Sequence, residues 1–297
     1  MSKDGDARIF QKEVVLRIYG AELQALKQVL QQVSALPGLS VSLFGKDNEY
    51  LVRLLVTSGG EAASNQLCES AAQMIEDALG EDVYGRGDHT LAHYAAAALL
   101  IKSATLATVS PELGELLAAE FSTTKRGERV FDFGAKTYQV HGNFAPKAKT
   151  IQQFGASSIQ AATELAFAAM KKGRAKYGAA LSQPDGTGRR WAVVTEKNRA
   201  FVRQLPPDAS GHAAALAVLD LVRRILAKGD FPQGDACYRK GHVNPTKPLK
   251  NPRGRGKLLA ICAVCVLLLL TGAACLYFSG IYAPFSAEAI QAFAKWG

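Results

Sequence analysis

The chain has 297 residues, of which 48% are hydrophobic and 21% are charged. This length and composition exclude a disordered chain and a mini-protein, and they allow about two globular domains. The net charge is +9, but seven cations with no acid among them lie between Arg239 and Lys257. Because a phosphate-tracking surface spreads its cations over a folded face, this concentration argues against a nucleic-acid-binding protein.

The first segment predicts a small mixed module over residues 10–84. Val14, Leu16 and Ile18 alternate as in a half-buried strand, and apolar residues at helical spacing follow over 23–33. Further elements complete the module: strands at 39–45 and 49–57, an amphipathic helix at 62–79 and a short closing strand at 82–84. This βαββα order resembles a KH-like module. The GxxG loop with which KH domains clamp RNA is missing from the sequence, so we do not expect nucleic-acid binding.

A second domain is expected over residues 85–228. Its predicted elements are a helix at 89–102 capped by Asp88, a strand at 104–109, a helix at 111–121, an extended stretch at 129–140, a helix at 157–171, a strand at 177–181, a hairpin of 191–195 with 200–205, and a helix at 209–227. Alternating strands and helices of this kind predict an α/β fold, here a three-layer αβα sandwich. A linker rich in Pro, Gly and basic residues follows at 229–257.

A single transmembrane helix is predicted near the C-terminus. Leu258–Phe278 is a run of 21 residues without a charge, which at about 1.5 Å per residue spans the roughly 30 Å of bilayer hydrocarbon. Five cations lie between Lys247 and Lys257, against Lys295 alone beyond the span. The positive-inside bias therefore places the N-terminal domains in the cytoplasm, leaves 279–297 as a short extracytoplasmic tail, and makes membrane lipid a partner.

Neither the cysteines nor the histidines indicate a metal or redox site. Three of the five cysteines fall inside the predicted span, where we interpret them as packing residues, and no disulfide framework follows. His89 and His93 share one helical face, but a metal would need a third ligand. We therefore expect no metal and no cofactor.

The turn at Ser110 is the most informative site in the sequence. A predicted strand ends there and a helix opens at Pro111, so the hydroxyl lies beside helix N–H groups that can hold an oxyanion or a phosphate. The plainer interpretation is a helix cap, since Ser at the N-cap followed by Pro is common helix-start chemistry. The residues alone favour the cap.

These features together resemble the CinA family, over about residues 10–228. The resemblance covers the KH-like middle region and the C-terminal domain known as the nicotinamide-nucleotide amidase domain. The family joint YG-x-G-D-x-T-L appears as Tyr84–Leu91, the most specific match. The nucleophile motif A-E-S-C-T-G-G falls on 108–114, where Ser110 and Gly114 are retained while the glutamate, the threonine and the first glycine are lost.

The remaining family motifs are matched in part. The stretch F-x-x-G-x-x-x-Y-S-N-x-x-K retains Phe131, Gly134 and Tyr138, but Asn143 stands where the family has its lysine. The helix-start G-A-V-S appears at 155–158, and the glycine-rich phosphate loop is reduced to 181–186. The resemblance implies Ser110 and Tyr138 as catalytic residues. The substrate-binding residues that it implies are Gly114, Ser157, Gln183 and Gly186.

Two functional hypotheses follow from this resemblance and from the positions at which the sequence departs from the family motifs. An amidase needs a base for its serine and donors for the oxyanion, and the family lysine that would complete this unit is missing. Lys136, Lys147, Lys149 and His141 are the nearest substitutes, each at a different offset. The leading hypothesis is a membrane-anchored CinA-like protein with a degenerate amidase domain, which serves as a binding or scaffold module. The alternative is an active amidohydrolase that converts nicotinamide mononucleotide to nicotinate mononucleotide and ammonia.

The same resemblance suggests where the protein acts and what it meets. CinA proteins are bacterial, so we expect a single-pass protein of the bacterial plasma membrane with its domains on the cytoplasmic side. A nucleotide ligand, a protein partner and a homo-oligomer are the expected interactions besides lipid. The basic run of 239–257 could also bind anionic lipid, although any positive-inside flank needs the same charges.

Overall fold

The computed structural model describes residues 10–131, 145–232 and 234–244. The chain divides into two compact units, Met1–Leu249 and Lys250–Gly297, and every described residue belongs to the first. The predicted transmembrane helix and the tail at 279–297 lie outside the described residues, so the anchor stays a prediction. Among the residues that are described, no helix is both long and apolar enough to cross a bilayer.

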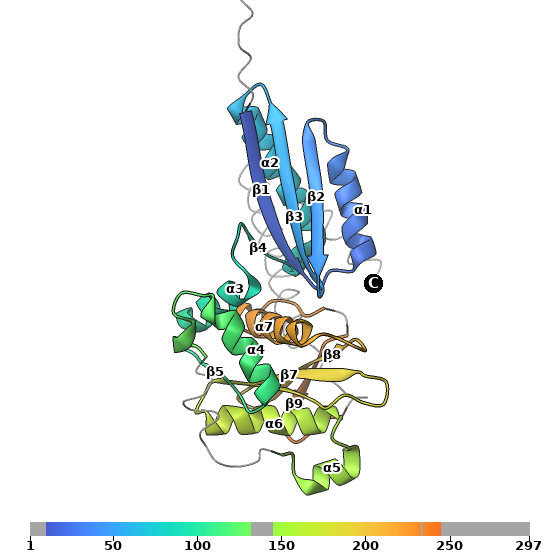
Figure 1. Ribbon diagram of the computed structural model, residues 1–297, viewed down its shortest axis with the longest axis vertical. Helices are drawn as coiled ribbons and strands as arrows, with labels where there is room; N and C mark the ends of the chain where they lie inside the picture. The colour runs from blue at the N-terminus through green and yellow to red at the C-terminus, as the bar shows by residue number, and fades with distance from the viewer. Residues whose placement is uncertain (1–9, 132–144, 233, 245–297) are drawn as a thin grey trace, which may run out of the picture. The chain divides into compact units, whose positions relative to one another are not determined.

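The N-terminal module, residues 10–86, has the predicted βαββα order with a closing strand. Its elements are β1 (Phe10–Tyr19), α1 (Leu23–Ser34), β2 (Leu39–Lys46), β3 (Glu49–Ser58), α2 (Glu61–Leu79), a 3₁₀ turn (Gly80–Asp82) and β4 (Val83–Arg86). The strands form one antiparallel sheet in the order β2-β3-β1-β4. Both helices pack on the same face of this sheet (Figure 1).

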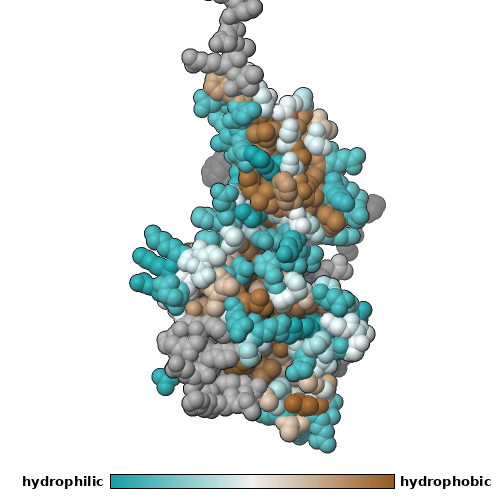
Figure 2. All heavy atoms as spheres, viewed as in Figure 1, coloured by the Kyte–Doolittle hydropathy of each residue, from teal (hydrophilic) through white to brown (hydrophobic). Residues whose placement is uncertain are grey.

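Side-chain alternation sets which face of this sheet forms the core. Leu16 and Ile18 are fully buried against the helices, as their period of two predicts. In α1 the buried residues are Leu26, Leu30 and Val33, whereas Leu23, also expected inside, is 38% exposed. On the opposite face Phe44 is 59% exposed and pairs with Leu51 of β3. Figure 2 shows apolar side chains gathered over these strands.

The joint at Tyr84–Leu91 is held by packing and by ion pairs. A Cβ on Gly85 would lie 2.1 Å from Tyr94 Cζ, so a larger residue there would force the Tyr94 ring to shift. The Tyr94 hydroxyl accepts a hydrogen bond from the Arg86 N–H at 3.1 Å and donates to the Arg86 carbonyl at 3.2 Å. The Arg86 guanidinium forms two hydrogen bonds with Glu76, at 2.7 and 2.8 Å. The helix α3 (Leu91–Ile101) has Thr90 at its N-cap position, so the prediction of Asp88 as the cap was wrong.

The α/β domain, residues 88–244, contains a second sheet in the order β5-β6-β7-β8-β9. Its strands are β5 (Leu106–Thr108), β6 (Tyr177–Leu181), β7 (Arg190–Glu196), β8 (Arg199–Leu205) and β9 (Ala236–Arg239). β5 pairs with β6 in parallel, and the other pairings are antiparallel. The last strand lies inside the region predicted as a linker, so that prediction was wrong for 236–239. Tyr238 is buried at 3% exposure, which ties this edge strand to the core.

Helices cover both faces of the second sheet, as expected for three layers. They are α3, α4 (Pro111–Ser122), α5 (Ala148–Phe154), α6 (Ile159–Lys172) and α7 (Gly211–Ala227). α6 packs on one face against β6 and β7, while α4 and α7 lie on the other face (Figure 1). Neighbouring residues of β7 confirm the two faces, because Val193 belongs to the α6 side and Val194 to the α7 side.

Two segments of this domain differ from the sequence-based expectation. The short helix α5 was not predicted. Residues 127–129 form a 3₁₀ turn where the sequence suggested an extended stretch from 129, and the rest of that stretch from 132 to 140 lies outside the described residues.

Candidate functional site

The turn between β5 and α4 presents Ser110 at the start of a helix. Ser110 occupies the N-cap position with extended backbone angles, but its side chain makes no capping hydrogen bond. The Ser110 N–H donates to Thr108 Oγ1 at 3.2 Å, and the Ser110 carbonyl accepts from the Gly114 N–H at 2.9 Å. The residue is therefore a cap by position, and its hydroxyl is not committed to satisfying the helix end.

A cavity of about 420 Å³ opens beside this turn. It is lined by Val109 to Glu112 of the turn, by Leu165 of α6, by Leu181 to Pro184 at the end of β6, and by Arg190. Two of the predicted site residues, Ser110 and Gln183, are thus brought together. Three others, Gly114, Ser157 and Gly186, are not among the residues that line this cavity. Tyr138 lies outside the described residues, and its assignment stays a prediction.

An ion pair between Glu112 and Arg190 occupies one side of the cavity. Arg190 Nη1 and Nη2 donate to the two carboxylate oxygens of Glu112 at 2.9 and 2.8 Å. Arg190 Nε donates to the Ser182 carbonyl at 3.1 Å. The hydrogen bonds from Arg190 hold the pKa of Glu112 below its ordinary value, and those to Glu112 raise the pKa of Arg190. The guanidinium is therefore bound to a carboxylate instead of being free for a phosphate.

In the turn after β6, backbone N–H groups donate hydrogen bonds to a side chain of the same turn. Asp185 Oδ1 accepts hydrogen bonds from the N–H groups of Thr187 at 2.8 Å and Arg189 at 3.0 Å, and from Thr187 Oγ1 at 2.7 Å. In the family pattern this region is a glycine-rich loop near a phosphate. Here the carboxylate of Asp185 occupies the N–H groups that a phosphate would need.

The start of α6 is organised by Ser158, the neighbour of the predicted Ser157. Ser158 Oγ accepts from the Ala161 N–H at 3.1 Å and donates to the Gly155 carbonyl at 2.7 Å. This is an ordinary N-cap. The sequence prediction chose the serine that precedes the capping residue.

The lysines considered as substitute bases have different surroundings. Lys147 lies in another cavity, where its Nζ is 3.7 Å from Glu164 Oε1. Lys136 and His141 lie outside the described residues.

The two histidines considered as metal ligands are close to each other. The rings of His89 and His93 have centroids 5.0 Å apart. Within the described ranges no group of three or more His, Cys, Asp or Glu residues is arranged to hold a metal ion.

Sequence reasoning missed the roles of Glu112 and Arg190. The two residues are 78 positions apart, and no sequence motif links them. Two strand pairings place them together: β5, which precedes Glu112, lies parallel to β6, and β7, which begins at Arg190, lies antiparallel to β6. The Asp185 turn carries a local signal, because Asn and Asp side chains readily accept hydrogen bonds from backbone N–H groups that follow them in a turn.

Comparison with known proteins identifies distant bacterial relatives. No protein-family model matches the chain. A Clostridium acetobutylicum protein with the provisional name "competence-damage inducible protein" is 28% identical over 178 residues, covering 59% of this chain and 43% of the relative. A "CinA-like protein" of Kosmotoga olearia is 23% identical over 229 residues, covering 71% of this chain and 56% of the relative. The chain spans about half the length of the curated relatives it matches.

Solved structures give a weaker similarity. A CinA superfamily protein from Klebsiella pneumoniae is 18% identical and covers 46% of this chain and 94% of that one, with a TM-score of 0.36. A score of this size does not establish a common fold. The sequence relatives carry competence-damage inducible and CinA-like names, which is the family that the motifs at 84–91 and 108–114 resemble.

Proposed function

We propose that this protein is a CinA-like binding module in which the amidase chemistry of the Ser110 cavity is degenerate. The observation that carries the proposal is the bidentate pair between Glu112 and Arg190. A carboxylate in the first turn of α4 takes the place beside the helix N-terminus where an anionic group of a substrate would be stabilised.

The electrostatics of the cavity support binding over hydrolysis. A nucleotide phosphate needs cations or unpaired backbone N–H groups. Arg190 is neutralised by Glu112, and the donors of the following turn are taken by Asp185. Amide hydrolysis also develops negative charge on the oxyanion, and the paired guanidinium of Arg190 is not free to stabilise that charge. The cavity therefore favours a ligand held by its neutral polar groups.

The second candidate function is the amidohydrolase itself, and one observation favours it. Ser110 Oγ makes no capping bond, and the residue lines a cavity at a helix N-terminus. A serine in this position can attack an amide carbon while the helix N–H groups stabilise the oxyanion. Ammonia leaves as the acyl-enzyme ester forms and carries away the proton of the serine hydroxyl, and water then hydrolyses the ester to nicotinate mononucleotide and free serine.

Ammonia release from nicotinamide mononucleotide distinguishes the two functions. The full-length protein is assayed beside Ser110→Ala and beside Ser122→Ala, a control at the exposed end of the same helix. We expect no turnover by any of the three. Turnover by wild type and Ser122→Ala that Ser110→Ala abolishes would refute the degenerate site and establish the amidase.

Ligand binding is measured separately by thermal shift. Nicotinamide riboside lacks the phosphate, so a site without a phosphate clamp should be stabilised by the riboside as much as by the mononucleotide. A shift produced by the mononucleotide alone would contradict the reasoning from Arg190 and Asp185.

We further propose that Leu258–Phe278 anchors the module to the bacterial plasma membrane with residues 1–257 in the cytoplasm. The support is the uncharged run of 21 residues and the cations that precede it. The full chain should stay in the membrane fraction after carbonate extraction, and a chain ending at Leu249 should not. Release of the full chain by carbonate would overturn the anchor.

A further inference from the structure

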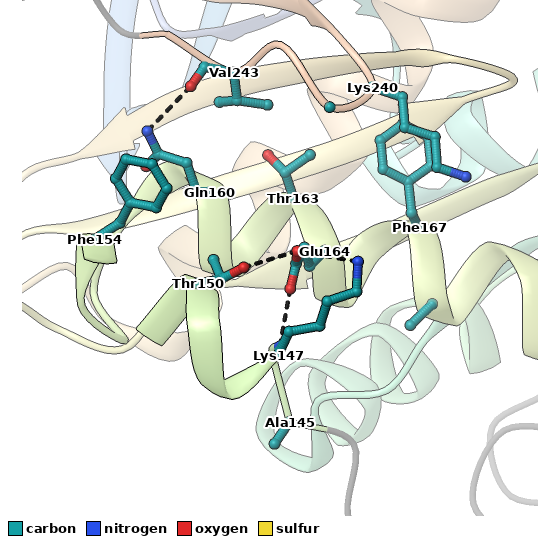
Figure 3. A pocket seen from close by; sticks show the side chains of 12 residues that line it. Ala145, Lys147, Thr150, Phe154, Gln160, Thr163, Glu164, Phe167, Lys240 and Val243 are labelled. Carbon is teal, nitrogen blue, oxygen red and sulfur yellow. Dashed lines mark hydrogen bonds and ion pairs between the residues drawn. The ribbon is translucent and has the colours of Figure 1, made fainter. Parts of the chain in front are cut away.

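A second cavity, of about 460 Å³, lies on the α6 side of the second sheet. It is bounded by α5, by α6 and by the residues that follow β9. Gln160 Nε2 donates to the Val243 carbonyl at 3.1 Å, which fixes the segment after β9 against α6 (Figure 3). The volume falls within the range of small-molecule sites, and Phe154, Phe167 and Val243 give the cavity an apolar wall.

One side chain of this cavity carries an unsatisfied polar atom. Thr163 is 3% exposed, and its Oγ1 has no hydrogen-bond partner among the described residues. In Figure 3 Thr163 lies between Gln160 and Phe167, on the face of α6 that these residues share. A buried hydroxyl without a partner is costly, and each such group calls for an explanation. A helical threonine has two accessible χ1 rotamers, so this hydroxyl can turn to a ligand without backbone movement.

The charges of the cavity do not cancel among the described residues. Glu164 is compensated, because it accepts hydrogen bonds from the Lys147 N–H at 2.9 Å and from Thr150 Oγ1 at 2.8 Å and lies near the Lys147 ammonium. Lys240 Nζ lies 4.9 Å from the centroid of the Phe167 ring, and no described carboxylate pairs with it. The cavity thus offers one cation beside an aromatic wall.

We propose that this cavity binds a small aromatic carboxylate that carries a second hydrogen-bonding group. The ring packs on the apolar wall, the carboxylate pairs with the Lys240 ammonium, and the second group meets Thr163 Oγ1. This arrangement gives the unpartnered hydroxyl a hydrogen-bond partner and adds an ion pair at the exposed Lys240 ammonium. The proposal is independent of the Ser110 cavity, since none of its residues line that site.

Calorimetric titration of the full-length protein in lipid nanodiscs tests the proposal. The probes are the three hydroxybenzoate isomers, benzoate, and the matching neutral hydroxybenzamides, with empty nanodiscs as the blank. The variants are Lys240→Gln, Thr163→Val and the control Lys27→Gln, an exposed lysine of α1. At least one hydroxybenzoate should bind more tightly than its amide.

The variants separate the two contacts. Lys240→Gln should weaken hydroxybenzoate binding about fivefold, the effect of an exposed ion pair, while Lys27→Gln changes nothing. Thr163→Val should weaken hydroxybenzoate about threefold to tenfold and leave benzoate unaffected. Absence of binding by all the carboxylates at millimolar concentration would overturn the proposal. Equal binding of acid and amide, or binding that neither variant changes, would overturn it as well.

Discussion

A buried carboxylate in α7 organises three arginines, and its removal gives a sharp test of the fold. Asp220 is completely buried. It accepts hydrogen bonds from Arg223 Nη2 at 2.5 Å, from Arg224 Nε at 2.8 Å and from Arg203 Nη2 at 2.8 Å. We expect Asp220→Asn to destabilise the protein strongly, because the amide group presents N–H donors to guanidinium N–H donors.

The size of the effect follows from the charge balance of the cluster. The three guanidinium groups face three carboxylates, since Arg203 also pairs with Asp235 and Arg224 with Asp82. The substitution leaves one positive charge uncompensated in the interior. Breaking a buried pair in this way costs about 3–5 kcal/mol, a large part of the roughly 5–15 kcal/mol that stabilises a typical domain. The thermal midpoint should fall by on the order of 10 °C.

Unfolding of the full-length protein followed by circular dichroism at pH 7 measures this loss. Asp208→Asn is the matched control, because Asp208 is exposed and has φ +58°, a conformation that Asn tolerates. The control should unfold like wild type. If Asp220→Asn unfolds within about 1 kcal/mol of wild type, water or rearrangement compensates the charges and the reasoning fails.

The pH dependence gives a second readout of the same group. Burial alone would raise the pKa of Asp220, but the neighbouring arginines outweigh it and hold the pKa below its ordinary value. A depressed carboxyl pKa adds stability above the unfolded value of about 3.9 and loses it as the pH falls toward the folded value. The stability gap between wild type and Asp220→Asn should therefore be full near neutral pH and should narrow below about pH 4.

Three further substitutions test packing, each by thermal unfolding. Gly85→Ala should lower the free energy of unfolding by about 1–3 kcal/mol, because its Cβ would overlap a tyrosine ring of α3. Gly59→Ala is the control and should be tolerated, because there is open space around its Cβ. Equal losses of stability in the two variants would contradict the argument. Leu26→Ala should cost about 2–5 kcal/mol and Leu23→Ala much less, since one is fully buried and the other is 38% exposed. Thr163→Val should raise stability by about 1 kcal/mol by removing the unpaired hydroxyl; a loss would mean that the hydroxyl has a partner.

Periodicity predicted the elements whose apolar residues face one core. The strands β1 and β3 and the helix α7 agree with their predicted spans to within a few residues, because alternation or helical spacing runs through each of them. β9 was missed since four residues between glycines and prolines carry no such pattern. It exists because β8 offers an open edge and Tyr238 has a buried place beside it.

The candidate site could be predicted only in its local part. Ser110 and Gln183 follow strands that are neighbours in the sheet, so their meeting is a consequence of strand order. The pair of Glu112 with Arg190 depends on how one helix start faces one strand start. No local pattern encodes such a contact, and the sequence analysis therefore missed it.

The family resemblance carries different meaning in the joint motif and in the nucleophile motif. At the joint, the matched Gly85 leaves room for the Tyr94 ring. This contact is structural, so a match there reports the fold and says nothing about catalysis. Around Ser110 the residues that replace the family pattern change the electrostatics of the cavity, since Glu112 now neutralises Arg190. The chain thus resembles the family most closely at residues that maintain the fold, and it departs from the family at residues that would determine catalysis. For this reason an assay for serine-dependent ammonia release is stronger evidence about activity than the number of motif residues that match.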